Sequence, residues 1–176
     1  MSVPYSVLPI ELSNVSDEDV QNLHLACESE YGGEDGEDAK IRQHHIFWAE
    51  KSITSSLTNI GENFGPKRFF VAVRNEGALM GCLGIKQGRL CHLNVHPDFR
   101  REGVASALLE RVRAEVTSDP AETLKSITVS CMQHMEPAIA FYERNGFKRT
   151  RTANYRNKRL KLSLVTVYFQ LDLRSD

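Results

Sequence analysis

The pattern of hydrophobic and polar positions along the chain predicts seven β-strands. Residues 69–73 and 79–86 are rich in β-forming residues, and the turn signal Asn75-Glu76-Gly77 joins them. Residues 162–173 are almost continuous in such residues. The expected strands are residues 5–12, 69–73, 79–86, 89–95, 124–130, 147–154 and 162–173.

Four other segments carry the signals of helices. Ser16, three residues before Asp19, resembles a capping box, which opens a helix. Pro137 suits a first helical position, and Gly146 suits the residue after a helix end. The expected helices are one that begins after Ser16, and then residues 38–57, 103–117 and 137–146. The resulting order of elements is β α α β β β α β α β β.

Length and charge narrow the classes of protein to which this chain can belong. A chain of 176 residues is long enough for one domain, 1–176, that buries about two-thirds of its unfolded surface. A net charge of -1 and a pI near 6.6 argue against a protein that binds nucleic acid electrostatically. One local basic cluster is either a solvated hairpin or a functional patch. It consists of Lys148, Arg149, Arg151, Arg156, Lys158, Arg159 and Lys161.

The cysteines indicate a reducing compartment and no metal site. Cys27, Cys82, Cys91 and Cys131 form no CxxC pair and have no metal-like spacing with histidine, so we interpret them as small core residues. No stretch approaches about 18 consecutive apolar residues, and residues 1–10 lack the pattern of a secretory signal. The sequence therefore predicts a cytoplasmic protein.

One run, residues 93–109, leads from a strand through a turn into a helix. Val95 ends a β-prone stretch, and Gly103 precedes an apolar pattern at helical spacing. The first N–H groups of such a helix lack intrahelical partners and lie at the positive end of its dipole. Since Arg100 and Arg101 add positive charge, this turn can bind a pyrophosphate.

The same run resembles the coenzyme A signature of the GCN5-related N-acetyltransferases (GNAT). That signature is Arg or Gln, two residues, Gly, one residue, and then Gly or Ala, as in Arg100-Arg101-Glu102-Gly103-Val104-Ala105. Residues 138–147 resemble the second signature of the family. The resemblance covers essentially the whole chain and implies an α/β (α+β) fold. In this fold about four helices flank a mixed, mostly antiparallel sheet of about seven strands, splayed where acetyl-CoA enters.

The resemblance also implies which residues contact the cofactor. Main-chain groups of Leu93 and Val95 would pair with the pantetheine arm, with the Val95 N–H facing the thioester oxygen. Tyr142 occupies the family's tyrosine position and is the expected general acid, since a phenol of pKa near 10 can protonate a thiolate of pKa about 8.5. The alternative is that Tyr142 only packs on the cofactor and hydrogen-bonds to its sulfur. The expected cofactor-binding residues are Leu93, Asn94, Val95, Arg100, Arg101, Glu102, Gly103, Val104, Ala105, Ser106 and Tyr142.

The general base is marked less clearly. Strict alternation along residues 89–95 puts Arg89 and Cys91 on the side that faces the cofactor, and neither suits a base. His92 falls on the opposite side, which favours a structural or surface role. His134, at the end of the following strand, lies nearer the expected acceptor site and is the candidate base. A chain of water molecules is the alternative.

Three features bear on the acceptor. Met135 stands where many relatives carry an Asn that binds the cofactor arm, and residues 131–138 resemble the branch that acetylates small amines and cysteine conjugates. Six carboxylates within residues 28–38 form either an attractive surface for a cationic amine or a solvated loop. The residues that either shape the acceptor pocket or pack a helix are His44, His45 and Trp48.

The sequence therefore predicts acetyl transfer from acetyl-CoA directly to a primary amine, without an acyl-enzyme and without a metal. The expected acceptor is a small molecule or an exposed amino-acid or peptide amine, and neither nucleic acid nor membrane is an expected partner. A protein lysine or N-terminal amine is the alternative acceptor. A non-catalytic acyl-CoA sensor is the alternative from another class. The chain is expected to be a monomer or a homodimer.

Overall fold

The computed structural model describes residues 5–118 and 124–173, and its described part contains one seven-stranded sheet. The strands are β1 (Tyr5–Pro9), β2 (Phe69–Arg74), β3 (Leu79–Lys86), β4 (Arg89–Val95), β5 (Ser126–Met132), β6 (Lys148–Asn157) and β7 (Leu162–Asp172). Their spatial order is β1-β2-β3-β4-β5-β7-β6, and of these neighbouring pairs β4 and β5 run parallel while the others are antiparallel. The predicted mixed, mostly antiparallel sheet is confirmed.

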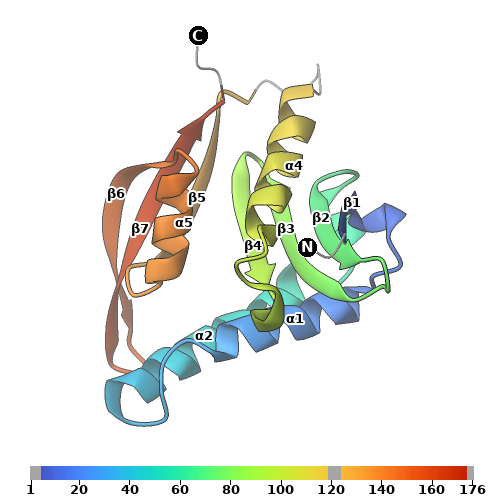
Figure 1. The fold of residues 1–176 in the computed structure, drawn as a ribbon. Coiled ribbons are helices and arrows are strands. Elements are labelled where there is room, and N and C mark those ends of the chain that lie inside the picture. Colours follow the sequence, from blue (N-terminus) through green and yellow to red (C-terminus); the bar gives the residue numbers. More distant parts are fainter. Residues whose placement is uncertain (1–4, 119–123, 174–176) are drawn as a thin grey trace.

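Helices cover both faces of this sheet (Figure 1). In the described residues they are α1 (Asp17–Ser29), α2 (Gly36–Ser55), α3 (Ile60–Phe64), α4 (Val104–Ser118) and α5 (Glu136–Arg144). The four predicted helices are present. The sequence pattern missed α3, because five residues are too few to establish a helical period.

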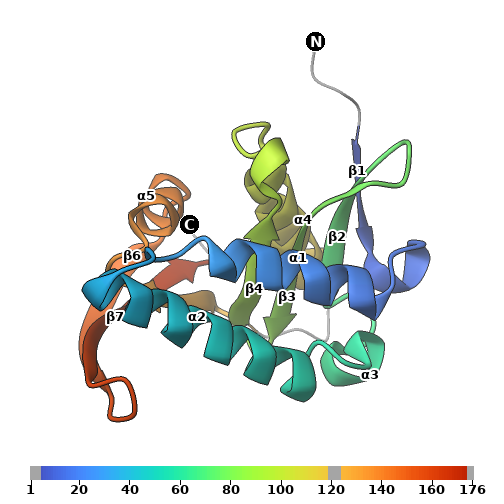
Figure 2. The same ribbon diagram turned by 90° about the horizontal axis from the view of Figure 1, so that it is seen from below.

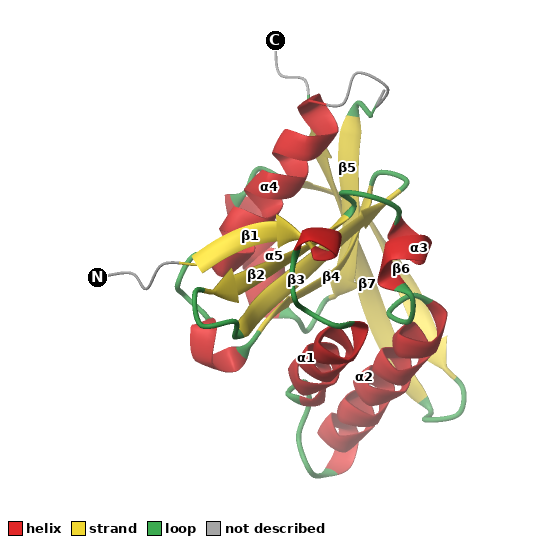
Figure 3. Cartoon of the chain, turned by 90° about the vertical axis from the view of Figure 1, so that its right-hand side faces the viewer, coloured by secondary structure: helices red, strands yellow, loops and turns green. Residues whose placement is uncertain are grey.

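Two hydrophobic cores form, one on each face of the sheet. The first lies beneath α4 and α5 and includes Leu108, Val112 and Ile139. The second lies beneath α1 and α3 and includes Val20 and Phe64. Figure 3 shows these helices on the two sides of the strands. Within the described residues, no helix combines the length and the apolar character needed to cross a bilayer.

Local signals explain where two elements begin and end. The Ser16 side chain accepts a hydrogen bond from the Asp19 N–H, and the Asp19 carboxylate accepts one from the Ser16 N–H, so the predicted capping box opens α1. The first strand is shorter than predicted, because β1 ends at Pro9 and residues Ile10–Leu12 form a 3-10 turn. Proline has no N–H to continue a strand ladder.

The sheet opens between β4 and β5. These two strands share a single residue pair, Arg89 with Thr128, and then diverge (Figure 1). Helices α1 and α2 pack side by side and run beneath the open end (Figure 2), where α1 contacts β4 and α2 reaches β7. The expected splay is therefore present, and the paired helices close it from below.

Candidate active site

A cleft of about 1360 Å³ lies in the splay. Its walls come from β4, β5, the end of α1, α2, the start of α4, and α5. All of the predicted cofactor-binding residues except Glu102 line the cleft. The lining ones are Leu93, Asn94, Val95, Arg100, Arg101, Gly103, Val104, Ala105, Ser106 and Tyr142. The structure therefore brings the two sequence signatures together around one space.

A β-bulge in β4 changes which side chains share a face. Cys82 of β3 pairs with Asn94, whereas Gly84 pairs with Cys91, so β4 has one extra residue at this point. His92 adopts a positive φ of 56° within the bulge. As a result Cys91 packs into the core on the α1 side, while Leu93 packs into the core beneath α4. The prediction that strict alternation keeps Cys91 on the side of Leu93 was wrong, because a bulge shifts the two-residue period by one.

His92 and Asn94 have structural roles. The His92 Nε2 lies 3.0 Å from the Ser56 hydroxyl, and the buried Asn94 amide lies 3.0 Å from His24 Nδ1. Burial lowers the pKa of His92 to about 4, so its ring is neutral at physiological pH. Because its side chain points to α1, Asn94 offers the cleft its main chain.

The turn before α4 has the geometry of an anion site. Arg101 and Gly103 both have positive φ, 66° and 82°, a conformation that favours glycine. The first N–H groups of α4, at Val104, Ala105 and Ser106, are those that a helix leaves without intrahelical partners. All of these residues line the cleft, so the turn presents N–H donors to it.

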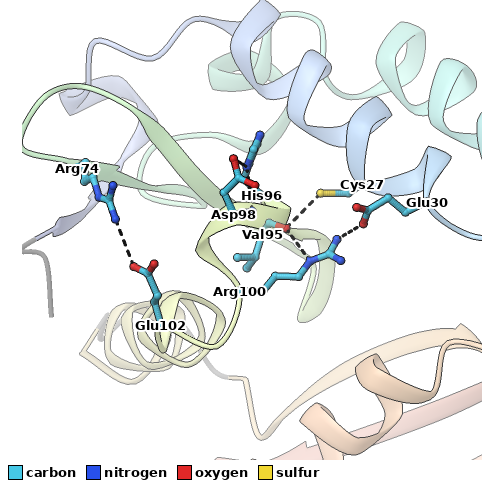
Figure 4. A network of polar contacts seen from close by, with 8 residues as sticks. All are labelled: Cys27, Glu30, Arg74, Val95, His96, Asp98, Arg100 and Glu102. Carbon is cyan, nitrogen blue, oxygen red and sulfur yellow. Dashed lines mark hydrogen bonds and ion pairs between the residues drawn. The ribbon is translucent and has the colours of Figure 1, made fainter.

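Two charged side chains of this turn, Arg100 and Glu102, already have partners (Figure 4). The Arg100 guanidinium pairs with Glu30 at the end of α1, and its Nε donates to the Val95 carbonyl at 3.4 Å. Glu102 lies outside the cleft lining, 3.6 Å from Arg74. Because these two side chains are paired, the turn offers an anion its main-chain N–H groups and the Arg101 side chain, for which no partner is found among the described residues.

Tyr142 projects from α5 into the aromatic core at the back of the cleft. Its ring lies 5.5 Å from Phe147 and 5.7 Å from Phe169, and only 6% of the residue is exposed. Burial raises the pKa of its phenol above the usual range, which keeps the hydroxyl protonated. Within the described residues that hydroxyl makes no hydrogen bond, although the residue lines the cleft.

His134 lies in the turn between β5 and α5, beside cleft residues Met132 and Met135, and is not itself in the lining. Its Nε2 is 2.8 Å from Nε2 of His45 on α2, and the His45 Nδ1 is 2.6 Å from the Glu28 carboxylate. His45 and Glu28 line the cleft. Sequence reasoning named His134 but missed both partners, since they are 89 and 106 positions away in the chain and no local pattern links them.

The other residues suggested for the acceptor end have mixed roles. His44 is 1% exposed, and its ring packs 5.4 Å from Tyr155 of β6. Trp48 is 38% exposed, with the Lys51 ammonium 4.8 Å from its ring centre. Both line the cleft, so they pack α2 against β6 and also border the open space.

Known proteins provide an independent comparison. Residues 65–149 match the family model of the acetyltransferase (GNAT) domain. The UPF0157 protein YqkA of Bacillus subtilis strain 168 is 31% identical over 87 residues, which are 47% of this chain and 24% of YqkA. The chain thus spans about a quarter of the length of that curated relative.

Solved structures share the fold at low identity. A GNAT-family acetyltransferase from Staphylococcus aureus Mu50 has a TM-score of 0.65 and 17% identity, and the match covers 97% of this chain and 100% of that one. A candidate streptothricin acetyltransferase from Bacillus anthracis strain Ames, solved in complex with acetyl coenzyme A, has a TM-score of 0.58 and 17% identity, covering 68% and 70%. Residues 65–149 thus match the acetyltransferase (GNAT) domain, and the chain shares the fold of these GNAT-family acetyltransferases.

Proposed function

We propose that this protein transfers acetyl from acetyl-CoA directly to a primary amine. One observation carries the proposal: a single cleft joins the Leu93–Val95 main chain, the N–H groups of the turn at Gly103, and the hydroxyl of Tyr142, which has no hydrogen-bond partner in the described part of the chain. A thioester donor with a pyrophosphate and an extended amide arm needs these three features at once.

The residues fit acetyl-CoA as the acyl donor. The N–H groups of residues 103–106 would hold the pyrophosphate, and Arg101 would add charge beside them. The main chain of Leu93 and Val95 would pair with the pantetheine amides, since β4 separates from β5 at this level and leaves room for an added strand. The B. anthracis neighbour that was solved with acetyl coenzyme A supports this assignment.

The chemistry requires a base, a site for the oxyanion and an acid. The amine nitrogen attacks the thioester carbonyl, the N–C bond forms, and the C–S bond breaks. The nitrogen's proton passes to His134, and Tyr142 donates its phenol proton to the departing thiolate. Solvent then returns the proton from His134 to the phenolate. The Val95 N–H is the proposed donor to the oxyanion. No acyl-enzyme is needed, and burial raises the pKa of the Cys91 thiol to about 11, which disfavours a nucleophilic thiolate.

The proposed acceptor is a small molecule or an exposed amino-acid amine. Glu28 and Glu30 line the acceptor end, yet each already pairs with a basic side chain, so the site does not present a row of free carboxylates. Tyr31, His44 and Trp48 border the same end and offer ring surfaces. This mixture favours an amine attached to an apolar or aromatic body over a highly charged polyamine.

We also propose that residues 1–176 form one domain in a cytoplasmic protein, as a monomer or a homodimer. Support for the single domain is the continuous sheet, which begins with β1 at Tyr5 and includes β7 up to Asp172. The four described cysteines are all free thiols, in keeping with a reducing compartment.

The test is thiol release from acetyl-CoA with a panel of amines, run beside calorimetry of coenzyme A binding. The panel contains arylalkylamines, amino acids, cysteine conjugates, polyamines, aminoglycosides and short peptides. Turnover with one small-amine class supports the proposal, and turnover with peptides alone assigns a protein acceptor instead. Tight cofactor binding without any turnover indicates a sensor, and no cofactor binding at all overturns the proposal.

A further inference from the structure

Three side chains from separate elements form a continuous hydrogen-bonded chain at the acceptor end of the cleft. The Glu28 Oε2 lies 2.6 Å from His45 Nδ1, and the His45 Nε2 lies 2.8 Å from His134 Nε2. The His45 side chain is 6% exposed and that of Glu28 19%. The chain links α1 and α2, below the splay, to the turn that follows β5.

The donors and acceptors of this chain fix where each proton lies. An ionised Glu28 only accepts, so His45 Nδ1 carries a proton and, in the neutral ring, His45 Nε2 is an acceptor. His134 must then donate through its Nε2, which leaves a lone pair on its Nδ1. Within the described residues Nδ1 of His134 makes no hydrogen bond, so it is the one nitrogen of the two rings that is free to accept a proton.

We propose that Glu28 and His45 position His134, which lies just outside the cleft lining, so that its Nδ1 accepts the proton of the acceptor amine through a water molecule. This inference rests on the proposed acetyl transfer. When the amine proton arrives at Nδ1, His134 becomes an imidazolium with both nitrogens protonated. Its Nε2 proton can then move to His45 Nε2, which places the positive charge beside the Glu28 carboxylate. His134 is thus the catalytic residue, and Glu28 and His45 are positioning residues.

The surroundings keep the chain ordered and the base neutral. Tyr31 stacks on His45 with ring centres 4.5 Å apart and meets His134 edge-on at 6.3 Å. Burial and the neighbouring His45 lower the pKa of His134, while the Glu28 charge raises it. His134 is therefore unprotonated at neutral pH, as a base must be.

Among the described residues, few other titratable groups face Glu28, His45 and His134. His44, next to His45, has its pKa lowered to about 4 by burial and by both histidines, so it stays neutral and adds no charge. Burial likewise keeps the Cys131 thiol and the Tyr31 phenol protonated, with pKa values raised to about 11 and about 12. Arg100, which lines the same cleft, is paired with Glu30. Glu28 therefore supplies the charge that acts on the two rings.

The test compares pH profiles of kcat/KM for the full chain with the best amine of the panel. Wild type should show a rising limb with an apparent pKa below about 6.5. His134→Asn should lose about 10²- to 10⁴-fold in kcat and lose this limb. Glu28→Gln should lose at least about tenfold and move the limb to lower pH, because the carboxylate charge that raises the pKa of His134 is gone. Coenzyme A affinity should be unchanged in both variants.

Two controls separate this role from a structural one. Glu18→Gln removes an exposed carboxylate of the same helix that has no described partner, and should leave rate and profile unchanged. The double variant Glu28→Gln with His134→Asn should be no slower than His134→Asn alone, since the positioning residue acts only through the base. A wild-type limb in His134→Asn, or additive losses in the double variant, would overturn the inference.

Imidazole ¹⁵N spectra test the hydrogen bonds that join Glu28, His45 and His134, and they do not require turnover. At pH 7.5 His134 should be the Nε2–H tautomer, and Glu28→Gln should lower the titration midpoint of His134. An Nδ1–H tautomer at His134, or a midpoint indifferent to Glu28, would contradict the chain even if acetyl transfer is established. If no amine is turned over but these spectra are as expected, the proposed function fails and the hydrogen-bonded arrangement of Glu28, His45 and His134 stands.

Discussion

The guanidinium of Arg100 pairs with the carboxylate of Glu30, which ties the turn before α4 to the end of α1 (Figure 4). The Nε of the same side chain donates to the Val95 carbonyl at 3.4 Å. Arg100 thus links the turn before α4, the end of β4 and the end of α1. Any pull of the pyrophosphate on Arg100 must compete with Glu30.

This competition predicts tighter coenzyme A binding in Glu30→Gln. A partly exposed ion pair contributes up to about 1 kcal/mol, so we expect the dissociation constant to fall by up to about fivefold, as measured by calorimetry. In an Arg100→Gln background the same change should have no effect. Weaker binding in Glu30→Gln would indicate instead that the pair holds the turn in its binding conformation.

Tyr142→Phe should separate chemistry from binding. Loss of the proposed general acid should lower kcat by about 10²- to 10⁴-fold, while coenzyme A affinity stays within about twofold. The free energy of unfolding should change by less than about 1 kcal/mol, because the hydroxyl makes no hydrogen bond within the described residues.

Tyr168→Phe is the matched control for this change. Tyr168 lies on β7 outside the cleft lining, with Arg151 stacked 3.7 Å from its ring centre. The acetyl-transfer rate of Tyr168→Phe should equal that of wild type. Equal rates for both variants would rule out Tyr142 as the acid and would favour the role in which it only packs against the cofactor.

Features that depend on neighbours in the sequence could be predicted. The capping box of Ser16 and Asp19 needs only three residues, and the Gly103 turn needs a strand end, a glycine and a helical pattern in order. The mixed, splayed sheet followed from the family resemblance, because periodicity alone does not show which strands pair or where they diverge.

Features that depend on contacts between distant parts of the chain could not be predicted from the sequence. The bulge at His92 arises from the register between β3 and β4, and so reverses the predicted face of Cys91 without any signal in the period of β4 itself. The contact of His134 with His45 depends on how α2 crosses beneath the splay, a packing relationship that no stretch of sequence records.

Acid should destabilise the protein through its buried histidines. His92 and His44 have pKa values lowered to about 4, whereas the unfolded chain has values near 6.5. The unfolded state therefore binds protons first as pH falls, so the stabilisation is complete above pH 6.5 and is lost toward pH 4. Each residue should contribute a slope of up to about 1.4 kcal/mol per pH unit to the unfolding free energy, measured with urea.

His92→Asn tests the assignment of this slope. Asparagine tolerates the positive φ at this position better than most residues, so the bulge can persist. At pH 5, unfolding of the variant should take up about one proton fewer than unfolding of wild type. The slope of its unfolding free energy against pH should therefore be smaller by up to about 1.4 kcal/mol per pH unit. An unchanged slope would mean that His92 titrates normally in the folded protein.

A methyl group at Gly81 should displace β4. Its Cβ would lie 2.7 Å from the main-chain oxygen of Asn94 and 3.1 Å from Val104 Cγ1, so both the cleft strand and the first residue of α4 are in its way. We expect Gly81→Ala to lose about 1–3 kcal/mol of unfolding free energy and to weaken coenzyme A binding, because the strand and the turn that we propose to hold the cofactor move apart. Gly61→Ala in α3 is the matched control, because a Cβ at Gly61 meets nothing within 4 Å. Since alanine also favours a helix, this variant should be as stable as wild type or up to about 1 kcal/mol more stable. Urea unfolding and calorimetry on the two variants decide the matter, and equal stability of both would show that β3 and β4 can separate at Gly81 without cost.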